Sequence, residues 1–447
     1  MVQDPSGTER DFTNRRSVLK AGAAALTVTG LAGCSGNGGG DSGDGGSNGG
    51  DGGDGGTNGG SSGSSDPITV GLLSPLSGAW TVYGRAHKRG FEIAIDQVNA
   101  DGGINGRQVE IILEDYETDP KIATERAQKL ARQDDVDVFA GSFSAASRNA
   151  VMNVANQAGL VLLFPTFYEG QVQSAYPGMC NDLLFNFGPT PDQQAGPWIE
   201  RMVSDHGSSL YYIGSDYSWP RIWRDQLERM LNERDISDYE FLGTEFMPFG
   251  TEDFSGVFSQ IEDTNPDIIF STLTGNNAGN FMKQFSGRGM KEDYTYWTMN
   301  DEEFTTQGLG PEASAGTYQS FDYFHMLDTE VNNQLIEALH NEYNADAGMN
   351  TVGVAMYNGG IAWAKAANQA GSIATDDVIA ALEGIEWEGP QGTITMREKD
   401  HQALLPSYHA RTREGWTDFN DMFEILGNEP NPDTPLGDCE YPLEYGN

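Results

Sequence analysis

The chain has 447 residues, which is long enough for two domains, and it carries 66 acidic against 26 basic residues, a net charge of −40. This balance excludes nucleic-acid binding, because neutralising phosphates requires a basic surface. The acidic residues are spread along the chain, which is typical of proteins that work in concentrated salt, where self-repulsion is screened. We therefore expect a halophilic archaeon as the source.

Residues 1–33 have the features of an export signal. Arg15 and Arg16 form a twin-arginine pattern, and the uncharged stretch at 21–33 is too short to span a bilayer stably. The stretch ends in Leu-Ala-Gly-Cys, which resembles a lipobox and predicts cleavage before Cys34, with a lipid on its sulfur. The alternative is an anchor helix without lipid. Both interpretations place the protein outside the cytoplasm.

From Cys34 to Asp66 the chain consists almost entirely of Gly, Ser, Asp and Asn, which predicts a flexible linker. A Gly/Asp-rich calcium repeat is the alternative, but its nine-residue period is absent. Two cysteines remain, Cys180 and Cys439, which either pair in an oxidising exterior or stay free thiols. No CxxC pair or His/Cys cluster is present, so we expect no metal and no cofactor.

After Pro67 the chain alternates between apolar runs and amphipathic segments. A first set predicts strands at 68–73, 108–115, 136–141 and 160–164, with helices at 85–100, 124–133 and 147–159. A second set predicts strands at 209–215, 240–246, 266–273 and 294–300, with helices at 221–234, 254–264 and 276–289. Two long helices, at 329–346 and 352–371, and a short strand at 392–396 follow. Such alternation indicates parallel βαβ units.

Two sets of this size predict an α/β fold of two doubly wound lobes rather than a single sheet. In open α/β sheets, ligands bind beyond the carboxyl ends of the strands. Hydroxyl, amide, carboxylate or aromatic groups follow five of the predicted strands, at 141–148, 165–170, 215–221, 274–279 and 300–304. Five such loops around one plane predict a cleft between the lobes that binds a small polar molecule.

Residues 72–115 and 141–171 resemble type I solute-binding proteins of ABC transporters, in the branched-chain amino acid, urea and amide group. Several stretches are similar to the urea and short-chain amide branch, namely GSFSAASR and PTFYEGQ within 141–171, then 188–197, 213–221, 300–304 and 388–396. The resemblance extends from Pro67 to about Leu426. It implies the type I periplasmic binding protein fold, in which a three-strand hinge joins the lobes and the ligand lies between them.

The same resemblance implies how the chain is divided. Residues 1–33 form the signal and 34–66 the lipidated linker; lobe 1 comprises 67–187 plus 322–387, lobe 2 comprises 188–321 plus 388–426, and 427–447 form a tail. Two positions depart from the amide branch. Phe164 stands where Tyr is usual, and Ala145 where a hydroxyl is frequent. The two lost hydroxyls favour a ligand with an apolar portion over bare urea.

Ligand-binding residues are expected at strand ends in both lobes. The helix start after Ser144 offers N–H groups and hydroxyls to a ligand oxygen, although Ser144 and Ser147 equally suit plain helix caps. Glu169 accepts ligand N–H groups when ionised, or else it makes a hinge contact together with Tyr168. The predicted set is Trp80, Tyr83, Phe143, Ser144, Ser147, Phe164, Thr166, Tyr168, Glu169, Asp216, Tyr217, Asn276, Asn300 and Asp301.

The sequence leaves alternative roles open for some polar and charged residues and predicts structural or surface positions for others. Asp216 either accepts amide N–H groups or caps the helix that follows it. Asn300 or Asp301 is expected to face the cleft, with Glu302 and Glu303 in solvent. A structural ion pair is expected for Arg148, and the surface of the last segment for His401 and His409.

No nucleophile elbow, HExxH motif or P-loop is present, so we expect no catalytic residues and no enzyme. The resemblance and the tether predict a lipid-anchored protein outside the cell, exported by the twin-arginine route. It captures urea or a short amide and delivers it to an ABC permease. The alternatives are a receptor for branched-chain or other amino acids, a tethered sensor that docks on a signalling receptor, and a secreted amidase.

Overall fold

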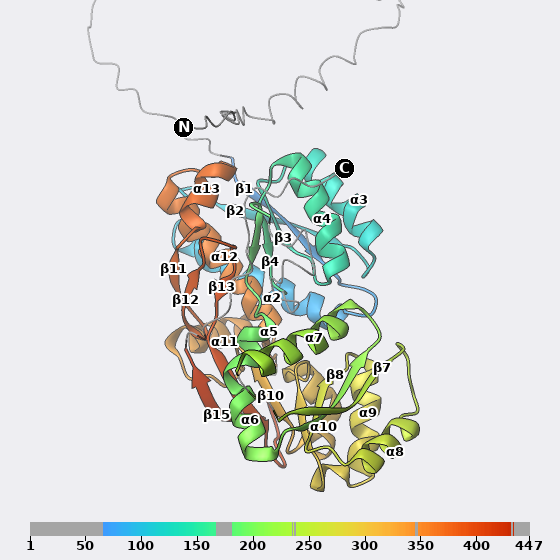
Figure 1. The fold of residues 1–447 in the computed structure, drawn as a ribbon. Helices are drawn as coiled ribbons and strands as arrows, with labels where there is room; N and C mark the ends of the chain where they lie inside the picture. The colour runs from blue at the N-terminus through green and yellow to red at the C-terminus, as the bar shows by residue number, and fades with distance from the viewer. Residues whose placement is uncertain are drawn as a thin grey trace, which may run out of the picture. The chain divides into compact units, whose positions relative to one another are not determined.

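A computed structural model describes residues 66–166, 181–234, 236, 238–344, 347–430 and 432. The predictions for Cys34, Tyr168, Glu169, Cys180 and Cys439 lie outside the described residues. Residues 66–430 contain two α/β lobes, each built on its own sheet, which confirms the predicted fold class (Figure 1). Among the described residues, no helix combines the length and the apolar character that crossing a bilayer requires.

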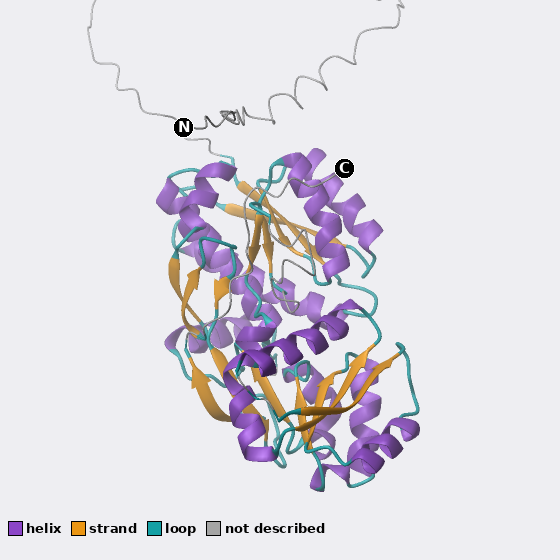
Figure 2. Ribbon diagram, in the orientation of Figure 1, coloured by secondary structure: helices purple, strands orange, loops and turns teal. Residues whose placement is uncertain are grey.

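Lobe 1 is built on a five-stranded parallel sheet in the order β2-β1-β3-β4-β5. Its strands are β1 (Ile68–Ser74), β2 (Val109–Asp115), β3 (Val138–Gly141), β4 (Leu162–Phe164) and β5 (Leu184–Asn186). One face is covered by α3 (Pro120–Arg132) and α4 (Ala145–Ala158), and the other by α2 (Thr81–Ala100), α12 (Thr351–Ala370) and α13 (Thr375–Leu382), as Figure 2 shows. All five strands end at the same edge of the sheet.

Lobe 2 is built on a seven-stranded sheet in the order β15-β14-β10-β9-β8-β6-β7. The parallel strands are β6 (Ser209–Ser215), β7 (Glu240–Met247), β8 (Ile268–Thr272), β9 (Thr295–Thr298) and β10 (Tyr318–Phe321). The antiparallel strands β14 (Ser407–Thr412) and β15 (Phe423–Glu429) extend the sheet beyond β10. Apolar side chains of the helices pack on both faces, so this sheet is also doubly covered.

One face of the lobe 2 sheet packs against α6 (Ile199–His206) and α7 (Ser218–Glu233), preceded by the short α5 (Pro191–Gln194) and η1 (Gly196–Trp198). The other face packs against α8 (Ser255–Thr264), α9 (Asn276–Gly287) and α10 (Glu303–Ser314), with η2 (Met290–Glu292) before β9. Because five of the strands are parallel, their carboxyl ends form one edge, as in lobe 1.

After β10 the chain runs through α11 (Glu330–Glu342) to α12, which packs against α2 of lobe 1. A three-stranded antiparallel sheet then follows, made of β11 (Glu386–Gly389), β12 (Gly392–Met396) and β13 (Ala403–Leu404). Its Trp387, Ile394 and Met396 belong to the same apolar cluster as residues of β1 and α2. The division of the chain into lobes at 188, 322 and 388 stays a prediction.

Two histidines expected at the surface are buried, each with 1% of its area exposed. The ring of His401 stacks on Phe185 with ring centroids 4.1 Å apart. His409 lies in β14, where its ring stacks against Trp198 and Tyr318. The surface prediction for His409 was wrong because β14, whose polar side chains are buried against partners distant in sequence, was not recognised. His401 lies between β12 and β13, where it contacts Phe185 and Glu383, and no local pattern reveals these distant partners either.

Candidate ligand-binding site

Lobe 1 presents aromatic side chains beyond the carboxyl ends of β1 and β3. Phe143, in the loop after β3, stacks on Tyr83 of α2 with ring centroids 4.7 Å apart. Its ring centroid also lies 5.2 Å from that of Trp80, the residue that precedes α2. All three side chains are only partly buried. The structure therefore brings these three predicted residues together as one aromatic surface at the strand ends.

The start of α4 lies beside this surface and is held by a capping box. The hydroxyl of Ser144 accepts from the N–H of Ser147, and the hydroxyl of Ser147 accepts from the N–H of Ser144, each at 3.1 Å. Both hydroxyls thus have helix-capping partners, as the alternative interpretation expected. The N–H groups of Ala145 and Ala146 have no intrahelical acceptor at this terminus, so the helix start retains donors for a ligand oxygen.

Three further polar groups at this edge are buried and have no hydrogen-bond partner within the described ranges. They are Thr166 Oγ1 just after β4, Ser74 Oγ at the end of β1 and the hydroxyl of Tyr116 just after β2. The Tyr116 hydroxyl lies near Ser147 but outside hydrogen-bond geometry. Phe164 is also buried, and the Arg148 guanidinium lies 5.3 Å from the centroid of its ring. The Phe164 side chain is therefore packed in the interior beneath the end of β4.

Lobe 2 places a buried carboxyl group after β9. Asp301 is 1% exposed, and neither of its carboxylate oxygens has a hydrogen-bond partner among the described residues. The Nδ2 atom of its neighbour Asn300 is likewise buried without an acceptor. Burial raises the pKa of Asp301 to about 7, and repulsion from Glu302 adds to the shift. Asp301 and Asn300 are thus an acceptor and a donor that await partners.

The expectation that Glu302 and Glu303 face solvent was wrong, since they are 3% and 1% exposed. Glu302 is the N-cap of α10, accepts from the N–H groups of Phe304 and Thr305, and receives Asn350 Nδ2 at 2.8 Å. Glu303 accepts from the N–H of His325 at 2.7 Å. Burial raises the pKa of both carboxyls. A run of acidic residues in the sequence could not show that Glu302 caps a helix and Glu303 supports a loop.

The aromatic surface of lobe 1 comes near the segment after β9 of lobe 2 at Tyr83. Burial raises the pKa of the Tyr83 hydroxyl, and the charge of Glu302 adds to the shift, whereas the nearby side chains of Thr305 and Asn300 oppose it. A side chain on α2 of lobe 1 therefore lies within reach of the segment after β9 in lobe 2. The predicted residues Trp80, Tyr83, Phe143, Thr166, Asn300 and Asp301 accordingly belong to the facing edges of the two sheets.

The remaining predicted residues of lobe 2 are less buried. Asp216 is exposed and pairs with Arg221 at 2.6 Å, and the N-cap of α7 is Tyr217 rather than Asp216. Tyr217 stacks near Trp219 and lies 5.3 Å, centroid to centroid, from the exposed Phe249. Asn276 is exposed at the first position of α9. These residues line the ends of β6 and β8 without taking part in the buried polar group.

Ser74, Tyr116 and His87 were missed by the sequence reasoning. Ser74 and Tyr116 stand at strand ends, so the rule that selected Thr166 also applies to them. His87 lies on α2, four residues after Tyr83 and hence on the same helix face, which is the one pattern that points to it.

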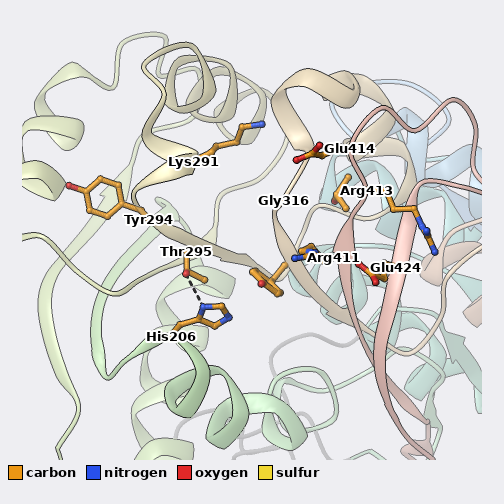
Figure 3. Close-up of a pocket in the computed structure, with 11 residues that line it drawn as sticks. His206, Lys291, Tyr294, Thr295, Gly316, Arg411, Arg413, Glu414 and Glu424 are labelled. Carbon is orange, nitrogen blue, oxygen red and sulfur yellow. Dashed lines mark hydrogen bonds and ion pairs between the residues drawn. The ribbon is translucent and has the colours of Figure 1, made fainter.

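A separate pocket of about 530 Å³ lies in lobe 2 at the opposite end of the sheet, where β9 and β10 begin (Figure 3). Three of its cations already have partners. Lys291 donates to the carbonyl of Ala315 at 3.2 Å, Arg411 pairs with Glu424 at 2.8 Å, and Arg413 Nε donates to the carbonyl of Phe423 at 2.8 Å. These contacts connect η2, β14 and β15, so we regard the pocket as structural.

Comparisons with known proteins agree with this architecture. The family described as periplasmic binding protein matches residues 67–416. The chain is 23% identical over 402 residues to the Leu/Ile/Val-binding protein homolog 4 of Brucella abortus, covering 84% of this chain and 92% of that protein. An amino acid ABC transporter substrate-binding protein from Pseudomonas fluorescens has a similar structure, with a TM-score of 0.74, 22% identity and coverage of 83% and 97%.

A third similar structure is a solute-binding protein of an ABC transporter from Rhodopseudomonas palustris in complex with 3,4-dihydroxybenzoic acid. It has a TM-score of 0.72 and 19% identity, and the match covers 83% of this chain and 99% of that one. The two-lobed fold and the family match over most of the chain lead to one conclusion: this protein belongs to the periplasmic binding protein family.

Proposed function

We propose that the chain is an extracytoplasmic solute-binding protein that captures a small polar molecule between its lobes and delivers it to an ABC permease. The observation that carries the proposal is the set of buried polar groups without partners at the facing strand ends, namely Ser74, Tyr116, Thr166, Asn300 and Asp301. Buried polar groups are nearly always paired, and each orphan costs about 1–3 kcal/mol. Other polar atoms without partners occur elsewhere in both lobes, but these five stand at strand ends, where a ligand between the lobes would supply the partners.

The polar groups at the strand ends of the two lobes suggest which class of ligand binds. Donors at the start of α4 suit a carbonyl or carboxylate oxygen, and the Asp301 carboxylate suits N–H groups. An amino acid, urea or a short amide meets both requirements. The names of the Brucella and Pseudomonas relatives support an amino acid, whereas the strand-end motifs support urea or a short amide. The stack of Phe143 on Tyr83 favours a ligand with an apolar portion.

Ligand capture would work by closure of the lobes. A ligand that contacts Thr166 in lobe 1 and Asp301 in lobe 2 gains both sets of contacts only when the lobes are together, so it favours the closed state. Tyr83, whose hydroxyl lies near the segment after β9, would add to the contacts between the closed lobes. The predicted lipid on Cys34 and the linker that follows it would hold the protein at the membrane near its permease.

The substitution Asp301→Asn tests the binding proposal. We expect the affinity for the captured ligand to fall about tenfold to a hundredfold, because a hydrogen bond to a charged group contributes roughly 1.5–3 kcal/mol. Calorimetric titration with leucine, threonine, urea, acetamide and 4-hydroxybenzoate identifies the ligand and measures the loss.

The matched control for this test is Asp263→Asn, because it makes the same chemical change on the exposed surface of α8. This variant should bind as tightly as the wild type. Equal affinities of the wild type and Asp301→Asn would contradict the assignment of Asp301 to the cleft.

A further inference from the structure

His87 is a buried side chain that the residues around it leave without a partner. It is 0% exposed, and both of its ring nitrogens are buried without a hydrogen-bond partner in the part of the chain that the structure describes. A neutral imidazole always carries one N–H donor and one acceptor, so both halves of its hydrogen-bonding capacity are lost here. Because each unpaired buried group is unfavourable, an apolar residue would stabilise the fold better at this position.

The position of His87 connects it to the cleft. It lies one helical turn after Tyr83 on α2, and its ring centroid is 5.9 Å from that of Phe143, the ring on which Tyr83 stacks. The three rings thus form one group at the lobe 1 wall. Burial lowers the pKa of His87 to about 3, so the imidazole is neutral at pH 7 and combines a donor with an acceptor.

A group that both donates and accepts is complemented by another group that does both. Hydroxyls and primary amides have this property, whereas an aliphatic or an unsubstituted aromatic group has neither function. We propose that His87 is a further ligand-binding residue, which selects ligands that carry a hydroxyl or primary amide next to the portion packed on Phe143. This inference rests on the proposed function of the cleft and specifies the substrate class.

The test combines ligand pairs of similar shape with variants of His87. The pairs are threonine and valine, asparagine and leucine, and 4-hydroxybenzoate and benzoate, each titrated into the wild type, His87→Leu and His87→Gln. We expect the wild type to prefer the hydroxyl- or amide-bearing member of a bound pair by about tenfold. The preference should vanish in His87→Leu and return in part in His87→Gln, which keeps a donor and an acceptor. If the wild type binds only urea or acetamide, His87→Leu should weaken that binding by a similar factor.

Thermal unfolding of the ligand-free proteins gives a second readout. His87→Leu should raise the melting temperature, because it removes two unpaired nitrogens from the interior. The control His206→Leu removes a half-buried histidine at the far end of lobe 2, where Nδ1 lies 3.1 Å from Thr295 Oγ1. It should leave ligand preference unchanged and should not raise the melting temperature.

Three other results would overturn the proposal, each for a different reason. A lower melting temperature for His87→Leu would show that the imidazole has a structural partner. If His87→Leu is more stable but keeps the ligand preference of the wild type, the partner of the His87 ring is a buried water and not the ligand. A wild type that binds none of the probes would contradict the proposed function itself, and the selectivity proposal would fall with it.

Discussion

At the residue scale, the protonation of Asp301 would decide what the proposed cleft binds. Its pKa of about 7 means that the ligand-free protein holds a proton there at mildly acid pH, whereas an unfolded aspartate does not. Between about pH 4 and pH 7, the stability of the ligand-free protein therefore falls as the pH rises. Glu302 adds to the raised pKa of Asp301 and the nearby Thr298 opposes it, while the charge of Asp301 in turn raises the pKa of Tyr83 on α2 and of Tyr296 in β9.

This titration separates the two proposed ligand classes. An ammonium group needs the ionised carboxylate, so the affinity for an amino acid should drop about tenfold for each pH unit below 7. The affinity for urea or acetamide should change much less, because a protonated carboxyl still offers a carbonyl acceptor. Titrations between pH 5 and pH 8 measure both slopes, with Asp301→Asn as a control whose affinity should be flat. A bound amino acid whose affinity does not vary with pH would contradict the role of Asp301.

Residue types at strand ends could be predicted from the sequence, but their individual roles could not. Asp301 and Thr166 follow apolar runs, and the structure places both just beyond the carboxyl ends of β9 and β4; their role in a ligand cleft stays a prediction. Glu302 and Glu303 follow the same run, yet both are buried in contacts with Asn350, Phe304, Thr305 or His325. Those partners come from a helix start and from distant segments, so only the folded chain assigns them.

At the element scale, the position of α2 depends on its close packing against α12. A Cβ atom added to Gly90 would lie 1.9 Å from the carbonyl oxygen of Gly353. The two helices approach so closely only because neither carries a side chain at this point. Since α2 carries Trp80 at its start and Tyr83 and His87 on one face, the helix contact also positions the aromatic surface of lobe 1.

We expect Gly90→Ala to destabilise the fold by about 1–3 kcal/mol, because the helices must separate. Binding by the folded fraction should also weaken, since Tyr83 and His87 move with α2. The control is Gly279→Ala in α9, where an added Cβ meets no atom within 4 Å, and this change should stabilise by roughly 0.4–1 kcal/mol. Urea unfolding measures both effects; equal stability of the two variants would contradict the close-packing account.

Element positions were predicted best where local patterns dominate. The helix expected at 124–133 begins four residues earlier, because Asp119 caps α3 and Pro120 occupies its first position. The strands β5, β10, β11, β13, β14 and β15 were not predicted, and the helices α5, α6, α10 and α13 were also missed. In β14, polar and apolar residues are buried alike, so the burial of Ser407 and His409 depends on pairing with β10 and β15.

At the scale of the whole molecule, export and anchoring remain predictions of the first residues. The proposed lipid on Cys34 requires a thiol, so Cys34→Ser should be released from membranes or stay uncleaved. Cell fractionation and the mass of the mature protein measure the two outcomes. As a control, Cys439→Ser should fractionate as the wild type does. A Cys34→Ser variant that matures normally and stays with the membrane would contradict the anchor.

The charge of −40 governs the behaviour of the whole fold. Ion pairs such as Arg229 with Asp192 at 2.6 Å involve few of the 66 acidic residues, because the chain has only 26 basic ones. Most carboxylates therefore repel one another across the surface, and folding brings them closer together. Screening reduces this repulsion, since the Debye length falls from about 10 Å at 0.1 M salt to about 3 Å at 1 M.

We predict that the melting temperature rises markedly between dilute buffer and molar KCl or NaCl, with most of the rise complete once the repulsion is screened. A sucrose series of equal osmolality is the control, because sucrose strengthens burial through exclusion from the protein surface but screens no charge. Calorimetric melts across both series distinguish the two effects. The expected rise in salt should exceed that in sucrose. A melting temperature that is flat in salt, or that rises equally in sucrose, would remove self-repulsion as the reason and with it the inference that the chain is adapted to concentrated salt.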